Sequence, residues 1–140
     1  MSPAVPTRRW LRSLGAVVAG FATVAVLSMG ADALVYGAGL VRPGHAMSDP
    51  LFALAAVYRA AFTVAGGFVT ARLAPDRPMD HAWVLAGLGL LGGLGGVAAY
   101  YAANSPAFGP AWYVISIPAS AIPCVWLGAR WGMRARGAVA

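Results

Sequence analysis

Residues 82–103 read AWVLAGLGLLGGLGGVAAYYAA, a run of 22 residues without a charged side chain. A helix needs roughly 20 apolar residues to cross a hydrocarbon core about 30 Å thick. A helix is favoured over a strand, because a helix makes its backbone hydrogen bonds within the segment, as lipid requires. The run therefore predicts a membrane-spanning helix.

Three further apolar runs of similar length lie on either side of this segment. Residues 13–35 contain a single charge, at Asp32, and residues 51–71 contain a single charge, at Arg59. Residues 107–129 contain none. Turn-forming and helix-breaking residues occupy the connections, namely Arg42-Pro43-Gly44, Asp49-Pro50, Pro75 through Pro78, Asn104-Ser105-Pro106 and Gly109-Pro110.

Four such runs joined by short connections predict an all-α fold, an antiparallel bundle of four transmembrane helices that forms one integral membrane domain over residues 1–140. The composition agrees: 10% of the residues are charged and 60% are apolar, whereas roughly 25% are charged in an ordinary soluble domain. The net charge of +6 does not indicate nucleic-acid binding, because the cations punctuate hydrophobic runs rather than cover one exposed face. The expected surroundings are therefore a lipid bilayer.

The arginines are distributed unequally between the two ends of the predicted bundle. The end opposite the termini has Arg42 alone. Since Lys and Arg are retained on the cytoplasmic side of short loops, both termini are expected in the cytoplasm. Eight arginines lie at the terminal end: Arg8, Arg9, Arg12, Arg72, Arg77, Arg130, Arg134 and Arg136.

The use of arginine without any lysine, together with abundant Ala and Gly, is typical of a GC-rich bacterial genome, so the expected location is the bacterial cytoplasmic (inner) membrane. An alternative for residues 13–35 is a cleavable secretory signal. Arg8 and Arg9 precede this run, and Ser28-Met29-Gly30 supplies small residues behind its apolar part. The run is long for a signal, so a retained span is the preferred interpretation.

Small residues follow one stripe of the third predicted helix. Membrane helices associate through close packing of small side chains, and a spacing of four residues between them is typical of such contacts. The stripe predicts helix packing inside the bundle, with a homodimer seam or a pore lining as alternatives. The glycines of the stripe are Gly89, Gly93 and Gly96, and Gly92 is also a candidate packing residue because it precedes Gly96 by four residues.

Weakly polar side chains lie in a similar register on the other three predicted helices, and they are expected to face the bundle centre. Pro118 and Pro123 are expected to bend the fourth helix, because proline cannot donate the intrahelical hydrogen bond. The candidate polar lining consists of Ser28, Thr63, Thr70, Ser116 and Ser120.

Asp32 and Arg59 are the charges placed within spans. A charged group in a span is costly and usually turns toward the protein interior or water. From the distance along each helix to the nearest terminal-end arginine, both lie in the outer half of the membrane, about 10 Å apart along the normal. A long arginine side chain can close much of that gap. We therefore predict an intramembrane ion pair, which either locks two helices together or, alternatively, leaves Arg59 facing a cavity that attracts an anion.

The second connection, residues 72–81, holds five ionisable side chains. Asp76, Asp80 and His81 are a weak candidate for a metal site, because the segment has neither Cys nor Glu. A solvated turn whose charges pair with one another is preferred, with Asp80 near the start of the third helix, where its charge suits the helix dipole. His45 in the first connection is isolated and is not expected to be a ligand.

The residues indicate no catalytic machinery, cofactor site or metal site. Cys124 is the single cysteine, so neither an intramolecular disulfide nor a Cys-x-x-Cys pair is available. Ser116 and Ser120 have no visible base, and the four aspartates are scattered. The glycine-rich stretch lacks the preceding strand and the lysine of a phosphate-binding loop.

The stretch from Tyr58-Arg59 through Gly66-Gly67 and residues 71–75 to Arg77-Pro78-Met79 and His81-Ala82 resembles a group of small bacterial inner-membrane proteins with no assigned activity. The resemblance extends over nearly the whole chain and implies the four-helix fold and the compartment. The small multidrug transporters are similar only in length and number of spans. Their first helix carries a central glutamate, whereas Asp32 lies near an outer edge.

The function expected from these features is that of a non-enzymatic accessory or structural membrane component, associated with a second copy or with another membrane protein, and without nucleic acid as a partner. The alternative is a small oligomeric transporter or channel that uses Arg59 and the inward Ser and Thr faces as a polar path. A cavity reaching Arg59 would favour the alternative.

Overall fold

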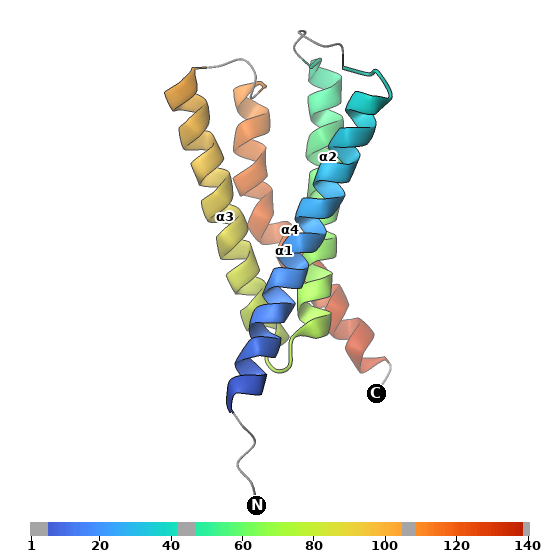
Figure 1. Cartoon of the computed structure of the whole chain (residues 1–140), viewed down its shortest axis with the longest axis vertical. Coiled ribbons are helices and arrows are strands. Elements are labelled where there is room, and N and C mark those ends of the chain that lie inside the picture. Colours follow the sequence, from blue (N-terminus) through green and yellow to red (C-terminus); the bar gives the residue numbers. More distant parts are fainter. Residues whose placement is uncertain (1–5, 42–46, 105–108, 139–140) are drawn as a thin grey trace, which may run out of the picture.

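The structure, a computed structural model, describes residues 6–41, 47–104 and 109–138 and forms a four-helix bundle (Figure 1). All four helices are long and apolar enough to cross a membrane. The prediction of an all-helical chain with four such helices is confirmed. In chain order they are α1 (Pro6–Gly37), α2 (Asp49–Leu73), α3 (Pro78–Ala103) and α4 (Ala111–Gly137).

Parts of the first and third connections lie outside the described residues. These parts include the predicted breakers at Arg42-Pro43-Gly44 and Ser105-Pro106, and also His45. The start of the predicted fourth run, at residues 107 and 108, lies outside them as well.

Six of the eight helix ends lie beyond the apolar runs that predict them, because their end residues suit helix termini. Pro50 and Pro78 stand in the first turn of α2 and α3, where a missing N–H costs nothing. Asn104 ends α3 in the left-handed conformation common at that position, with φ 44°. The helix α4 begins at Ala111 rather than at residue 107, since Gly109 has a positive φ of 87°.

The four helices share their contacts unequally (Figure 1). The most extensive contact is between α2 and α4, followed by α3 with α4 and α1 with α2, whereas α1 and α3 touch only sparsely. The start of α1 and the end of α4 lie at the same end of the bundle (Figure 1). Because eight of the ten arginines stand at the helix ends on this side, it is called here the arginine-rich end.

Glycines set the close contact between α2 and α4. A Cβ added at Gly128 would lie 2.8 Å from the carbonyl carbon of Val64 and 2.9 Å from the Phe68 nitrogen. At Gly132 it would lie 2.8 Å from the Phe68 carbonyl oxygen, and at Gly67 it would lie 2.9 Å from the Val125 Cα. The neighbouring atoms are backbone, so these glycines allow the two helices to approach as closely as they do.

The contact between α1 and α2 follows the same principle. A Cβ at Gly20 would lie 2.7 Å from the Gly66 carbonyl oxygen, and one at Gly66 would lie 2.8 Å from the Gly20 carbonyl oxygen. The two backbones therefore approach closely at these glycines, with the side chains of Thr70 and Val24 packed beside them.

The predicted glycine stripe on α3 meets α4 along part of its length. A Cβ at Gly93 would lie 2.8 Å from the Pro118 Cβ, and one at Gly89 would lie 3.5 Å from the Ala121 Cβ. Gly92 and Gly96 differ from the expectation, because no heavy atom lies within 4 Å of an added Cβ at either position. At these two positions α3 borders open space rather than a neighbouring helix.

Candidate functional site

The two charges within spans meet where α1 lies beside α2. The Arg59 Nη2 donates to Asp32 Oδ2 at 2.5 Å. The hydroxyl of Tyr58, the residue before Arg59, donates to the other oxygen, Asp32 Oδ1. One carboxylate therefore accepts from two consecutive residues of α2, and α1 is tied to α2 at this level.

The long side chain of Arg59 reaches across the axial offset estimated from the sequence, because its Nη2 lies within direct hydrogen-bonding distance of Asp32 Oδ2. The helix α1 is inclined relative to α2 (Figure 1).

The pair is only partly shielded. The side chains of Arg59 and Asp32 are 33% and 34% exposed, respectively, and Tyr113 of α4 lies next to Arg59. The Arg59 Nε is buried and has no hydrogen-bond partner within the described residues. A third of each side chain is therefore accessible to water or lipid headgroups, although both Asp32 oxygens accept hydrogen bonds and the Arg59 Nη2 donates one.

Three of the predicted lining hydroxyls bond to carbonyls of their own helices. Thr63 donates to the Arg59 carbonyl at 2.8 Å. Ser116 donates to the Tyr113 carbonyl at 2.6 Å, and Ser120 to that of Ile117 at 3.0 Å. Such back-bonding satisfies a hydroxyl within one helix, so these contacts do not link the helices.

Ser28 and Thr70, the other two predicted lining residues, are buried, Thr70 completely. The Thr70 hydroxyl has no hydrogen-bond partner within the described residues, and it lies against Gly20, where an added Cβ would overlap it. Thr70 therefore serves the tight contact between α1 and α2, rather than facing an open path.

A cavity of about 200 Å³ lies at the bundle centre. All four helices contribute to its wall, which is mainly apolar, as at Val24, Leu85 and Ile117. Thr63 also lines it, one turn along α2 from Arg59. The wall of the cavity is therefore apolar apart from the Thr63 hydroxyl, which already donates a hydrogen bond to the Arg59 carbonyl.

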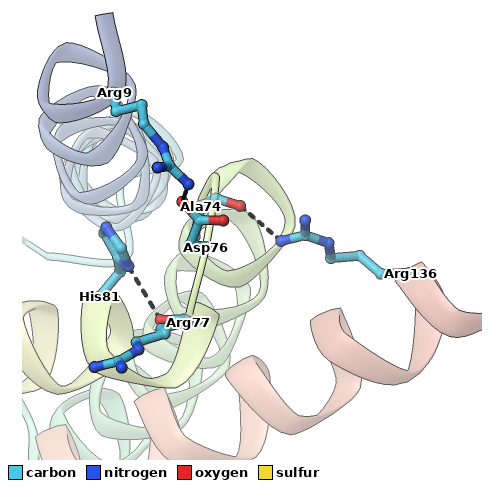
Figure 2. A network of polar contacts seen from close by, with 6 residues as sticks. All are labelled: Arg9, Ala74, Asp76, Arg77, His81 and Arg136. Atoms are coloured by element: carbon cyan, nitrogen blue, oxygen red, sulfur yellow. Dashed lines mark hydrogen bonds and ion pairs between the residues drawn. The ribbon is translucent and has the colours of Figure 1, made fainter. Parts of the chain in front are cut away.

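Polar contacts at the arginine-rich end tie the chain termini to the second connection (Figure 2). The Arg136 Nη1, from the end of α4, donates to the carbonyl oxygens of Ala71 at 3.0 Å and Ala74 at 2.7 Å. The last carbonyls of a helix lack partners within the helix and carry partial negative charge. Arg136 thereby caps the C-terminal end of α2.

The charges of the second connection pair within the turn and also with α1, and Figure 2 shows the pair formed with α1, between Arg9 and Asp76. The Asp80 Oδ2 lies 3.8 Å from the Arg77 Nη1, within the same turn. Asp76, expected to pair within the turn, instead binds Arg9 of α1 at 2.7 Å. The His81 Nδ1 is 3.1 Å from the Arg77 carbonyl oxygen. Within the described residues, no three His, Cys, Asp or Glu side chains are grouped so as to hold a metal.

Some of these contacts had a signal in the sequence. Gly128 and Gly132 are four residues apart, the spacing typical of close helix contacts. No feature of the sequence indicates that Arg136 caps α2, because an arginine near the end of a membrane helix is equally expected from the retention of positive charge in the cytoplasm. The hydrogen bond of the Tyr58 hydroxyl had no signal either, because interfacial tyrosines are common in membrane proteins.

The arrangement around Asp32 is a carboxylate held by a guanidinium and a phenol, which is suited to joining two helices at a fixed level. The hydroxyls nearby are satisfied within their own helices. No protein-family model, curated protein or solved structure matches this chain.

Proposed function

We propose that the chain is a multi-pass protein of the bacterial cytoplasmic membrane, and that it acts as a non-enzymatic accessory or structural component. Its helices form an antiparallel bundle with both termini in the cytoplasm. The bundle associates with another membrane protein or with a second copy of the chain.

The observation that carries this proposal is the pairing of polar groups between α1 and α2. Asp32 accepts from both Tyr58 and Arg59, and the nearby Thr63 hydroxyl bonds to its own helix. A path for a polar solute needs groups free to replace the hydration of that solute. Groups already engaged in joining helices favour a structural role.

The proposed topology is supported by the charge at the two bundle ends. The start of α1 and the end of α4 lie at the arginine-rich end (Figure 1), and arginines of short loops are retained in the cytoplasm. A membrane-impermeant maleimide tests this topology in intact cells, in a Cys124→Ser background. We expect Tyr36→Cys to be labelled from outside, and Ala138→Cys to be labelled only after permeabilisation. The reverse pattern would contradict the topology.

Transport by the bundle is the competing function, and the observation in its favour is the buried Arg59 Nε, which has no hydrogen-bond partner within the described residues. Arg59 itself does not line the central cavity, whereas Thr63, one turn along α2, does. Liposomes containing the purified protein distinguish the two. We expect anion flux equal to that of empty liposomes. A saturable flux that disappears in a folded Arg59→Gln variant but persists in Arg134→Gln would refute the structural role.

The accessory role is tested by crosslinking in the membrane, followed by purification in mild detergent. We expect one reproducible crosslinked partner, either a second copy or one other membrane protein, in amounts comparable to the chain itself. Recovery of the chain solely as an uncrosslinked monomer at native expression level would count against association.

A further inference from the structure

The last turns of α4 present an exposed face that carries two arginines. Trp126, Arg130 and Arg134 follow one another at spacings of four residues, which places them on one face of the helix. All three residues are exposed, whereas Gly128 and Gly132, on the opposite face, pack against α2. The arginine-bearing face of α4 is therefore turned away from the bundle.

This face has no counterion of its own. Within the described residues, neither Arg130 nor Arg134 forms an ion pair. The chain contains four aspartates and no glutamate, and Asp49 begins α2 at the other end of the bundle. The remaining three aspartates are engaged elsewhere, in the pairs Arg9–Asp76, Arg59–Asp32 and Arg77–Asp80. Two positive charges on α4 are thus left for an anion from outside the chain.

An aromatic ring holds one of the two guanidinium groups in place. The Arg130 Cζ lies over the Trp126 ring, 4.9 Å from its centroid, a distance at which a cation and an aromatic ring attract each other. An arginine stacked on a ring keeps its in-plane N–H donors for bidentate binding of a phosphate. Because the ring restrains the Arg130 side chain before a ligand arrives, binding costs less conformational entropy than binding by a mobile arginine.

The face lies where the apolar part of α4 ends. Arg130 directly follows the uncharged run 107–129, and Arg134 lies about 6 Å farther along the helix at 1.5 Å per residue. Trp126 and Trp131, both exposed, lie within about one turn of Arg130, and tryptophan is enriched at the level of the lipid headgroups. In the proposed membrane location, a headgroup phosphate is therefore the anion that this face meets.

We propose that the exposed face of α4 binds the headgroup of one anionic phospholipid, with the phosphate between Arg130 and Arg134 and the acyl chains along Trp126. This proposal rests on the proposed membrane location. An anionic lipid fits better than a zwitterionic one, because the choline of phosphatidylcholine is a cation and would be repelled by the two arginines. A second copy packed through the same face fits poorly, because it would bring two further arginines against these two.

Native mass spectrometry of the detergent-purified protein, titrated with phosphatidylglycerol or phosphatidylcholine, tests the site. Wild type is expected to bind phosphatidylglycerol more tightly. The double variant Arg130→Gln/Arg134→Gln should lower the phosphatidylglycerol affinity about 25-fold, about fivefold for each arginine, and change the phosphatidylcholine affinity by less than about twofold.

The matched control is Arg8→Gln/Arg12→Gln on α1. These arginines are also exposed, one turn apart and at the arginine-rich end, so the net charge of the chain changes by the same amount. No cation–π contact holds either of them within the part of the chain that the structure describes. The phosphatidylglycerol affinity should stay within about twofold of wild type. Equal losses in the two double variants would reduce the effect to overall charge and overturn the site.

The positioning role of Trp126 is tested separately. Trp126→Leu should lower the phosphatidylglycerol affinity about threefold, and Trp126→Phe should recover part of this loss, because it keeps an aromatic ring beside Arg130. The control Trp131→Leu, also at an exposed tryptophan, should leave the affinity unchanged. Identical affinities for Trp126→Leu and Trp126→Phe would refute the positioning by the ring.

Three further measurements separate this site from its alternatives. Glycerol phosphate that binds as tightly as phosphatidylglycerol would overturn the lipid assignment in favour of a free anion. Concentration-dependent dimerisation that the Arg130→Gln/Arg134→Gln variant changes would assign the face to a second copy. Extraction of cell membranes at alkaline pH tests the location itself. A chain that stays in the membrane but binds both lipids equally refutes only the lipid site, whereas a chain released into solution refutes the proposed location.

Discussion

The closest helix contact is the most sensitive point of the bundle, and Gly128→Ala tests it. The added methyl group would lie 2.8 Å from the Val64 carbonyl carbon and 2.9 Å from the Phe68 nitrogen, and closer still to the Val64 oxygen. All three are backbone atoms of α2. Since a helix backbone cannot turn aside as a side chain can, α2 and α4 must move apart.

Two opposing effects set the size of the change. Alanine favours a helix over glycine by about 1 kcal/mol. Overpacking of a well-packed contact costs about 1–3 kcal/mol, and the upper part of this range applies, because the neighbouring contacts at Gly67 and Gly132 are loosened together with the one at Gly128. We expect Gly128→Ala to lower the free energy of unfolding by about 2 kcal/mol.

The matched control is Gly95→Ala on α3, where no heavy atom lies within 4 Å of an added Cβ. Only the helix-propensity effect acts there, so the free energy of unfolding rises by up to about 1 kcal/mol. The two variants should differ by about 3 kcal/mol, in opposite directions from wild type.

Reversible unfolding in mixed micelles, followed by tryptophan fluorescence as the fraction of sodium dodecyl sulfate is raised, gives these free energies. Similar values for Gly128→Ala and Gly95→Ala would refute the reasoning, since the crossing of α2 and α4 would then not depend on the missing side chain.

Three other substitutions test the polar contacts by the same assay. Arg136→Ala removes the cap from α2 and should cost about 2 kcal/mol, with part of the loss recovered in Arg136→Lys, and a control Arg134→Ala within about 0.5 kcal/mol of wild type. Asp32→Ala should lower the free energy of unfolding by about 1–2 kcal/mol, less than for a fully buried pair because each partner is a third exposed. Adding Arg59→Ala to this variant should lower the free energy of unfolding little further, and strictly additive losses would argue against coupling between the two residues. Asp76→Ala should change stability by less than about 0.5 kcal/mol, because its ion pair is exposed, and a loss as large as that of Arg136→Ala would contradict this estimate.

The helices themselves could be predicted because their signal is local. A run such as residues 82–103 is long enough to cross a bilayer and contains no charge, and this needs no knowledge of the neighbouring helices. The first and last turns were less predictable. Arginine-bearing ends continue as helix outside the apolar run, so α4 extends to Gly137.

The helix contacts were less predictable because they depend on how each helix is rotated. Gly92 and Gly93 are adjacent in sequence and have the same composition around them, yet only Gly93 would touch α4 with an added Cβ. Spacing identifies a small-residue face, but the face used is decided by the crossing angle, which depends on every contact along both helices. Asp32 and Arg59 were easier to single out, because charges within spans are rare.

The dominance of the contact between α2 and α4 has a consequence for biosynthesis. Gly67 leaves the ribosome about 60 residues ahead of Gly128, so at about 5–20 residues per second α2 waits roughly 3–12 s for its main partner. During this interval, α1 is the earlier neighbour that can cover α2. In a chain stalled before residue 111, α4 would be absent. The glycine face of α2 and the carbonyls of Ala71 and Ala74 would then lack their partners and remain accessible to the insertion machinery.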